Sequence, residues 1–205
     1  APLDPPLHVF EESAARPLPP VPVGDWAGEY DQPTAKLCAE FGRLDDRVLD
    51  RSRRAYYAQL THLDKQIGRI YYWLQRREWL DDTYLIFLSD HGELLGDHRL
   101  FRKVTPHEGS AKVPFIVRPP GGDEFSRGVT RDEPVTHCDV MPTLLEEARA
   151  GTLEGLEGRS LSPLFRGGQA EWREYVHGEH TRERIGWQFV TDGREKFIWD
   201  SASGR

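Results

Sequence analysis

A long amphipathic helix is the clearest element that the pattern of apolar and polar positions predicts. Within residues 45–78, apolar side chains recur at alternating steps of four and three, at Tyr56, Leu60, Leu63, Ile67, Ile70 and Leu74. This spacing places them on one face of an α-helix. We expect Gly68, within this stripe, to mark a close contact with another segment, and the basic run at 51–54 to form a solvated face.

Two short apolar runs after this helix predict strands. Residues 84–88 and 113–117 are almost continuously apolar, which is typical of strands that are covered on both faces in a parallel sheet. The polar run Ser89-Asp90-His91-Gly92 follows the first of these strands directly. Because open α/β sheets bind ligands at the carboxyl edge of their strands, we expect this run to form part of a binding site.

The remaining segments predict loops, a shorter helix and a hairpin. Residues 1–34 are rich in proline and lack periodicity, so we expect an extended surface segment there, without a helix or strand. A helix is expected over 139–150, where a proline lies near the first turn and a glycine follows the end. Residues 187–191 and 196–199 flank an Asp-Gly pair, which predicts a β-hairpin.

Composition excludes several classes of function. The chain of 205 residues has a net charge of −7 and no basic stripe, which argues against a nucleic-acid partner. No run approaches the roughly 18 apolar residues that a membrane span requires. The two cysteines, Cys38 and Cys138, have no metal-binding spacing, and we expect each to be a small buried residue. A small molecule is therefore the partner to look for.

Asp90, His91 and Lys103 form the candidate site. A carboxylate beside an imidazole, next to a glycine, can bind a divalent cation. A lysine in the following loop suits an anionic group such as sulfate or phosphate. His98 and His107 lie in the same loop and are candidate proton donors. Taken singly, the Asp-His pair also fits a strand-end cap with a surface histidine, and the lysine fits a solvated side chain.

Several spaced motifs resemble those of one family. The run from Ser89 to His98 resembles the second signature of the sulfatases. The other segments that match, in the family's order, lie at 57–68, 103–110, 113–114, 139–144 and 158–161. The resemblance extends over about 56–165 and is greatest to bacterial arylsulfatases and phosphonate monoester hydrolases.

This resemblance implies the fold of the alkaline-phosphatase superfamily, an α/β sandwich with a mostly parallel central sheet. It implies that Asp90 and His91 supply half of the protein ligands of one divalent cation, with calcium favoured over manganese or magnesium. Lys103 would contact the oxygens of the sulfate or phosphoryl group. His107 stands where relatives often carry an aromatic residue, so it either faces the substrate or packs. The nucleophile would be a formylglycine, made from Cys or Ser in a Cys/Ser-x-Pro-x-Arg motif.

The chain departs from the family's pattern at the nucleophile. No Cys/Ser-x-Pro-x-Arg motif occurs in it, and the family's first metal aspartates are absent as well. We expect both in sequence that precedes Ala1, and we expect the 205-residue chain alone to be inactive. In the family, a histidine near the start of this region contacts the anion. Here Leu3 stands in its place, so His8 either substitutes as a substrate contact or is a surface residue.

The sequence therefore predicts a sulfuric ester hydrolase that uses formylglycine and one divalent metal. A phosphonate or phosphate monoester hydrolase of the same fold and a non-catalytic sulfatase-like module are the alternatives. We expect residues 1–168 to form the second half of the catalytic domain and 169–205 to begin an antiparallel C-terminal subdomain. A sheet without its first strands would expose an apolar edge, so a homo-oligomer is one expected outcome. The compartment, cytoplasmic or periplasmic, is left open.

Overall fold

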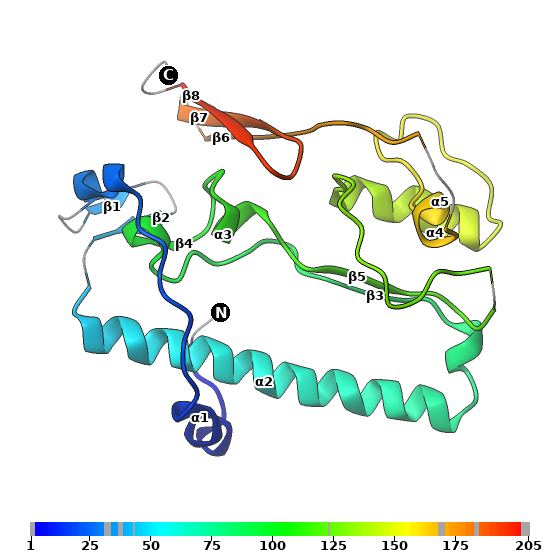
Figure 1. Ribbon diagram of the computed structural model, residues 1–205, viewed down its shortest axis with the longest axis horizontal. Coiled ribbons are helices and arrows are strands. Elements are labelled where there is room, and N and C mark those ends of the chain that lie inside the picture. The colour runs from blue at the N-terminus through cyan, green and yellow to red at the C-terminus, as the bar shows by residue number, and fades with distance from the viewer. Residues whose placement is uncertain are drawn as a thin grey trace. The chain divides into compact units, whose positions relative to one another are not determined.

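The computed structural model divides the chain into two compact units, residues 1–118 and 119–205. It describes residues 3–30, 34–36, 39–42, 44–122, 124–167, 171–182 and 185–201. Figure 1 shows the elements of both units, and 3₁₀ helices are written η in the text. The first unit contains α1 (Leu7–Ala14), η1 (Asp25–Tyr30), β1 (Thr34–Lys36), β2 (Ala39–Phe41), α2 (Asp46–Arg76), η2 (Leu80–Asp82), β3 (Leu85–Leu88), η3 (Asp97–Arg99), β4 (Leu100–Arg102), α3 (Glu108–Ala111) and β5 (Phe115–Arg118). The second contains η4 (His137–Asp139), α4 (Val140–Glu147), α5 (Ser162–Phe165), β6 (Val176–Arg182), β7 (Ile185–Thr191) and β8 (Lys196–Asp200).

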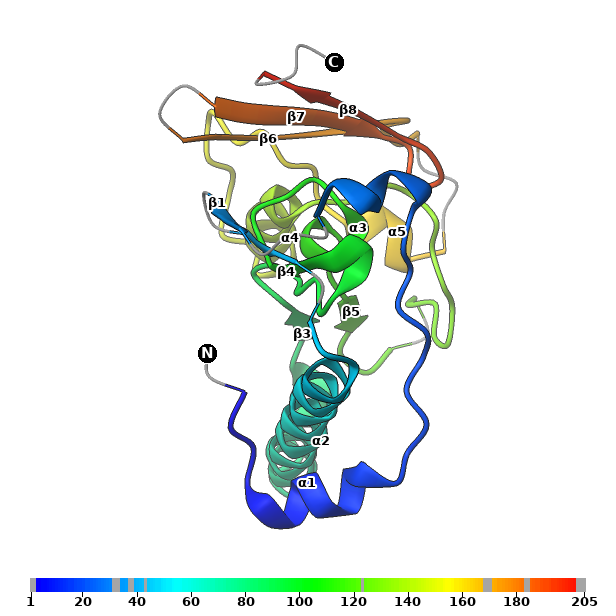
Figure 2. The same cartoon turned by 90° about the vertical axis from the view of Figure 1, so that its left-hand side faces the viewer.

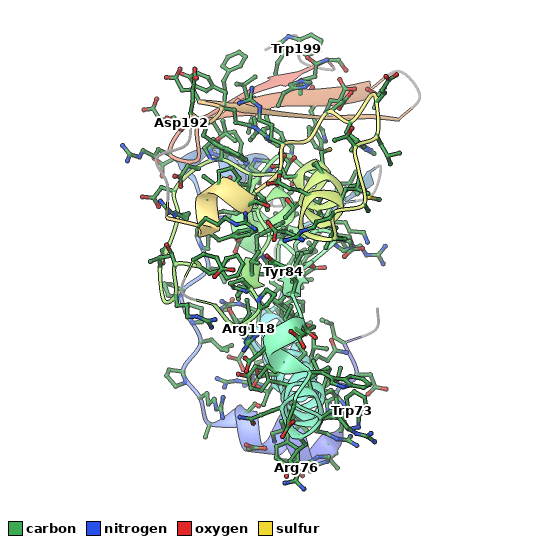
Figure 3. The ribbon with its side chains drawn as sticks, turned by 90° about the vertical axis from the view of Figure 1, so that its right-hand side faces the viewer. Trp73, Arg76, Tyr84, Arg118, Asp192 and Trp199 are labelled. Carbon is green, nitrogen blue, oxygen red and sulfur yellow. The ribbon has the colours of Figure 1, made fainter. Side chains whose placement is uncertain are left out.

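The helix that the apolar stripe predicted is present as α2. The Asp45 carboxylate accepts a hydrogen bond of 2.9 Å from the backbone N–H of Arg47, which satisfies one of the unpaired donors at the start of the helix. The helix ends at Arg76, which Figure 3 labels together with Trp73 at the C-terminal end of α2. The predicted helix over 45–78 is therefore confirmed.

The apolar stripe of α2 is largely open to solvent within the described residues. Leu63 is 45% exposed and Ile70 is 59% exposed, whereas Ala58 is fully buried. A β-carbon added to Gly68 would meet no atom within 4 Å, so the expected close contact at this glycine is wrong for the part of the chain that the structure describes.

A helix, α1, forms where the sequence predicted only an extended segment. Prolines lie on either side of 7–14 but not within it, and Pro6 serves as the N-cap, so the helix loses no internal hydrogen bond. α1 packs against α2 (Figure 2), and Val9 is fully buried. The Arg54 side chain of α2 donates to the carbonyl oxygens of Ala14 and Arg16 at 2.5 and 2.9 Å. The basic run is thus not simply solvated, because this arginine caps the C-terminal end of α1.

The strands β3 and β5 are those predicted from the two apolar runs, and they pair antiparallel, with Phe87 opposite Ile116. The mixed α/β class is confirmed, but every strand pair among the described residues is antiparallel, unlike the parallel pairing expected of these two strands. Phe87 and Ile116 are 37% and 60% exposed, so one face of the pair is open. An unbroken apolar run favours a strand covered on both faces, but it does not fix the direction of the neighbouring strand.

The loop between β3 and β5 is a folded segment. Its backbone closes on itself through Leu94 N–H to Arg102 O at 2.8 Å and Gly96 N–H to Leu100 O at 2.9 Å. Leu94 and Leu100 are buried beneath it, with 0% and 2% exposed. At its far edge β4 pairs with β2. The polar residues of the loop therefore project from a small core of their own.

The second unit confirms the shorter helix and the hairpin. α4 begins directly after Asp139, close to the start expected for it. β7 and β8 pair antiparallel around a turn in which the Asp192 carboxylate accepts the backbone N–H groups of Arg194 and Glu195, each at 2.8 Å. β6 adds a third strand that was not predicted, because its sequence, Val-His-Gly-Glu-His-Thr-Arg, lacks an apolar alternation.

Three further expectations concern the chain as a whole. Cys138 is exposed rather than buried, because it lies in η4 next to Asp139, which is the residue turned inward; Cys38 falls outside the described residues. Among the helices that the structure describes, none has the length and apolar composition needed to cross a membrane. The boundary expected after residue 168, between the catalytic domain and the C-terminal subdomain, stays a prediction.

Candidate active site

The candidate site lies at the junction of β3 and the loop that follows it. Gly92, at this junction, packs closely against Gly109 of α3. The backbone N–H of Gly92 donates to the carbonyl oxygen of Ser110 at 2.8 Å. A β-carbon at Gly92 would lie 3.0 Å from the carbonyl carbon of Gly109 and closer still to its oxygen. Only glycine allows this approach of two backbones. Asp90 and His91, immediately before it, are thereby placed at the carboxyl end of β3.

The ring of His91 has a defined orientation and tautomer. Its Nδ1 lies 2.7 Å from the carbonyl oxygen of Gly92, and because a carbonyl oxygen only accepts, Nδ1 carries the proton. In the neutral ring Nε2 then carries the lone pair. This atom lies 3.4 Å from Oδ2 of Asp90 and 2.5 Å from Nζ of Lys103. The three residues that the sequence singled out are therefore brought together.

Asp90 and His91 have the geometry of two neighbouring ligands of one cation. Two donor atoms at a right angle about a divalent cation, at the distances usual for calcium, are about 3.3–3.7 Å apart. The 3.4 Å between Oδ2 of Asp90 and Nε2 of His91 falls in this range. Among the described residues, no group of three or more His, Cys, Asp or Glu side chains is arranged to hold a metal. The pair therefore fits a metal as part of a ligand set.

Lys103 adds a positive charge to this pair of donors. Its side chain is half-buried and reaches the imidazole of His91, whose neighbour Asp90 has a side chain that is 85% exposed. A cation held by the pair and an ammonium group beside it would together attract an anionic ester and offset negative charge that develops on its oxygens. The individual roles assigned to the three residues stay predictions.

His107 lies in a cluster of rings next to this site. It caps α3, and its ring stacks on Trp26 of η1 with centroids 5.3 Å apart and planes 22° apart. His98 completes the cluster at 4.8 Å from Trp26, and its Nδ1 accepts the backbone N–H of Gly24 at 3.0 Å. Trp26 was missed from the sequence because it stands in a proline-rich segment without periodicity.

His8 lies on α1, far from the loop in sequence. It is exposed. This placement fits the surface alternative that the sequence left open. Its role as a substrate contact stays a prediction.

Two ionisable side chains at the base of the loop have shifted pKa values. Burial raises the pKa of Asp97, while the positive charge of Arg53 partly opposes this rise. Burial also raises the pKa of Tyr56 on α2, and the negative charge of Glu93 adds to this effect. The first turns of α2 therefore lie close to the acidic residues of the loop.

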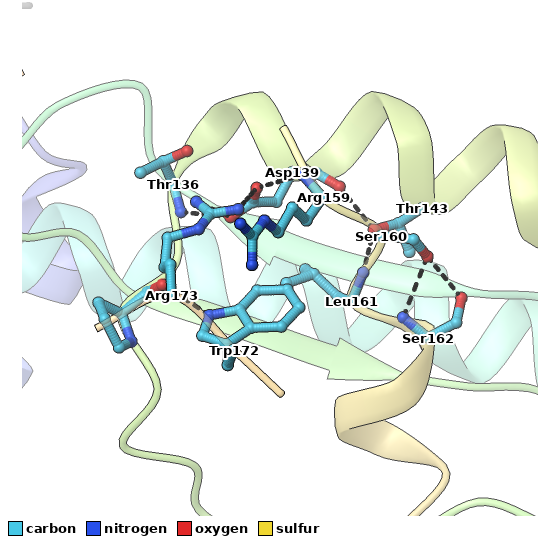
Figure 4. Close-up of polar contacts among 10 residues, drawn as sticks. Thr136, Asp139, Thr143, Arg159, Ser160, Leu161, Ser162, Trp172 and Arg173 are labelled. Atoms are coloured by element: carbon cyan, nitrogen blue, oxygen red, sulfur yellow. Dashed lines mark hydrogen bonds and ion pairs between the residues drawn. The ribbon is translucent and has the colours of Figure 1, made fainter. Parts of the chain in front are cut away.

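Asp139, which belongs to a motif in the sequence resemblance, is a structural centre of the second unit. Its fully buried carboxylate pairs with both terminal nitrogens of Arg173, at 2.5 and 3.0 Å (Figure 4). It also accepts the backbone N–H groups of Thr136 and Arg159, each at 2.8 Å. Four donors thus satisfy one buried carboxylate and tie three segments together. No spacing in the sequence indicates Arg173 as the partner.

Known proteins similar to this chain share these motifs and this fold. The Sulfatase family model matches residues 18–150. The arylsulfatase of Clostridium perfringens is 38% identical in an alignment of 208 positions that covers 100% of this chain and 43% of that protein. The choline-sulfatase of Rhizobium meliloti is 40% identical in an alignment of 158 positions that covers 73% of this chain and 29% of that protein. The chain thus spans less than half the length of these relatives.

Solved structures agree with the sequence comparisons. The phosphonate monoester hydrolase of Agrobacterium radiobacter aligns with a TM-score of 0.63 and 28% identity, covering 76% of this chain and 36% of that one. The α/β fold of sulfatases and phosphonate hydrolases is therefore the fold of this chain as well. Together with the match of the family model over 18–150, this establishes that the chain belongs to the sulfatase family.

Proposed function

We propose that the protein to which this chain belongs is a sulfuric ester hydrolase of the arylsulfatase type. The observation that carries the proposal is the convergence of Asp90, His91 and Lys103 at the end of β3. The match of the whole of this chain to 43% of an arylsulfatase, at 38% identity, supports the same activity. A small sulfate ester is the proposed substrate.

The residues of the site have distinct proposed roles. Nε2 of His91, which Lys103 contacts in this structure, would exchange that contact for one divalent cation bound together with Oδ2 of Asp90. The released Lys103 would contact the sulfate oxygens. We propose calcium first, since carboxylate oxygen is its usual ligand, whereas the imidazole nitrogen keeps manganese as an alternative. The cation would polarise the sulfate group and offset negative charge on it. The stack of His107 on Trp26 supports a role in shaping the site rather than in proton transfer.

The proposed nucleophile is a formylglycine. None of the 205 residues lies in a Cys/Ser-x-Pro-x-Arg motif, so its position is sought in the portion of the relatives that this chain does not span. Mass spectrometry of the full natural protein, isolated from its own cells, tests this directly. The expected result is a peptide carrying the aldehyde at such a motif, and an unmodified Cys or Ser, or no motif at all, would refute it.

Hydrolysis of 4-nitrophenyl sulfate by the full natural protein tests the activity. We expect turnover that a chelator abolishes and that calcium or manganese restores, and we expect Lys103→Ala to raise the KM and the inhibition constant of inorganic sulfate. Absence of turnover with metal and formylglycine both present would contradict the proposal and would favour the non-catalytic module.

A phosphonate monoester hydrolase is the second candidate, because a structure with that activity in its name is 28% identical. Both groups carry one negative charge, but a sulfate ester offers three non-bridging oxygens to Lys103, whereas a phosphonate monoester offers two and carries a carbon substituent on phosphorus. Comparing kcat/KM for 4-nitrophenyl sulfate and for the 4-nitrophenyl ester of phenylphosphonic acid separates them. A higher value for the phosphonate would reverse the preferred order.

A further inference from the structure

The backbone on both sides of Lys103 has an unusual conformation. Arg102 has φ of 66° and Val104 has φ of 72°, both in the left-handed region. That region is uncommon for residues other than glycine, and a β-branched residue such as Val104 is a genuine outlier there. Such a conformation is strained and persists only where its surroundings enforce it. The direction of Lys103 is therefore imposed by its surroundings.

The Glu93 side chain enforces this conformation on one side. Its Oε1 accepts the backbone N–H of Arg102 at 2.6 Å, and also that of Leu95 at 3.4 Å. The next residue, Leu94, donates its own N–H to the carbonyl oxygen of Arg102 at 2.8 Å and is fully buried. Both polar backbone groups of Arg102 are thus bound by two consecutive residues, one of which is anchored in the core of the loop.

The same segment carries the other half of the site. Glu93 follows Asp90, His91 and Gly92 without interruption. On the far side of Lys103, the backbone N–H of Thr105 donates to the side-chain oxygen of Ser110, at 3.3 Å. Ser110 in turn accepts the N–H of Gly92 through its carbonyl oxygen. The two ends of the strained turn are therefore tied to the segment that holds the metal ligands, and Lys103 reaches back to His91.

We propose that Glu93 is a positioning residue that sets the distance between the anion-binding lysine and the metal-binding pair. It acts through its hydrogen bond to the Arg102 N–H, which holds the left-handed turn and keeps Lys103 beside the metal-binding pair, where the sulfate group would lie. This inference rests on the proposed function, in which Lys103 contacts the sulfate group. A neutral acceptor at position 93 should preserve the position of the Arg102 N–H, because an amide oxygen can accept the same hydrogen bond, which is then weaker than the bond to the carboxylate.

Kinetics of Glu93 variants in the full natural protein test the proposal. Glu93→Ala should raise the KM for 4-nitrophenyl sulfate and the inhibition constant of inorganic sulfate, and lower kcat/KM by about 10- to 100-fold, because the lysine is displaced. Glu93→Gln, whose amide oxygen can accept the same N–H, should stay within about threefold of the unmodified protein. Glu11→Ala, an exposed glutamate on α1, is the matched control and should change nothing.

A double variant separates positioning from simple stabilisation. If Glu93 acts through Lys103, then Glu93→Ala combined with Lys103→Ala should be no worse than Lys103→Ala alone. A purely structural role would lower the melting temperature and the active fraction but leave KM and the sulfate inhibition constant unchanged, which would overturn the proposal. Additive losses, or a Glu93→Gln variant as impaired as Glu93→Ala, would overturn it as well.

Two further outcomes remain informative. If Glu93→Ala does not fold, Glu93→Asp replaces it, since the shorter side chain withdraws the acceptor and should raise the sulfate inhibition constant in a folded protein; an unchanged constant would contradict the inference. If Lys103→Ala itself leaves sulfate inhibition unchanged, the proposed function fails at that residue. A large effect of Lys103→Ala with none of Glu93→Ala rejects only the positioning role.

Discussion

Replacing Gly92 with alanine should disrupt the candidate site more than any other single methyl group added to the loop. The new β-carbon would collide with the carbonyl group of Gly109, whose carbon lies 3.0 Å away and whose oxygen is closer. The carbonyl oxygen of Ser110, 3.1 Å from the same position, blocks a second direction. The obstructing atoms belong to backbone rather than to flexible side chains, so the two segments must separate.

The magnitude follows from what this separation breaks. The hydrogen bond from Gly92 N–H to Ser110 O would be lost or lengthened, at a cost of about 1 kcal/mol. Overpacking in a folded interior adds roughly 1–3 kcal/mol. We therefore expect Gly92→Ala to lower the free energy of unfolding by about 2–4 kcal/mol. Because Gly92 directly follows His91, metal affinity should fall as well.

Urea unfolding of the unmodified and variant chains measures this loss through the shift of the midpoint at constant slope. Gly28→Ala is the matched control, since a β-carbon at Gly28 meets nothing within 4 Å, and it should leave the midpoint nearly unchanged. A Gly92→Ala variant as stable as the control would show that the backbones of Gly92 and Gly109 do not touch, and would refute the reasoning.

The remaining predictions concern stability in both units. Gly68→Ala should stabilise this chain by about 0.5–1 kcal/mol, because the position is open and helical, and a lower urea midpoint would indicate a contact there. Asp139→Ala should destabilise the chain by about 3–5 kcal/mol, because it leaves the largely buried Arg173 without its carboxylate, whereas the exposed Asp132→Ala should have little effect in the same assay. Burial raises the pKa of Asp97, so its contribution to stability is full below its unfolded pKa and is lost as the pH rises through the folded value. The stability of Asp97→Asn relative to the unmodified chain should therefore increase from about pH 3 to about pH 7, and a constant difference across that range would contradict the shift.

The elements that the sequence predicted well are those with local causes. The period of the apolar stripe in α2 and the Asp-Gly turn between β7 and β8 are set by residues close together in the chain. α1 was missed because its eight residues lie among prolines and depend on capping by Arg54, which is 40 positions away from Ala14. The antiparallel pairing of β3 and β5 was missed because the apolar runs specify strands and not their direction.

The candidate site shows the same division. Asp90, His91 and Lys103 were predicted because they belong to short sequence motifs, and the structure places them in contact. The stack of Trp26 on His107 was not predicted, since it joins residues 81 positions apart by sequence number and neither lies in a periodic segment. The left-handed conformations that flank Lys103 could not be predicted either, because they oppose the intrinsic preference of the residues and are imposed by the surrounding hydrogen bonds.

Calcium titration by calorimetry tests the central claim most directly, namely that Asp90 and His91 are ligands of one divalent cation. The full natural protein should bind one calcium ion, and Asp90→Asn should weaken binding by at least about 100-fold, more than a residue behind the ligands would. Asp97→Asn, in the same loop, is the control and should bind calcium like the unmodified protein. Equal affinity of the Asp90→Asn variant and the unmodified protein, for calcium and for manganese, would contradict the account.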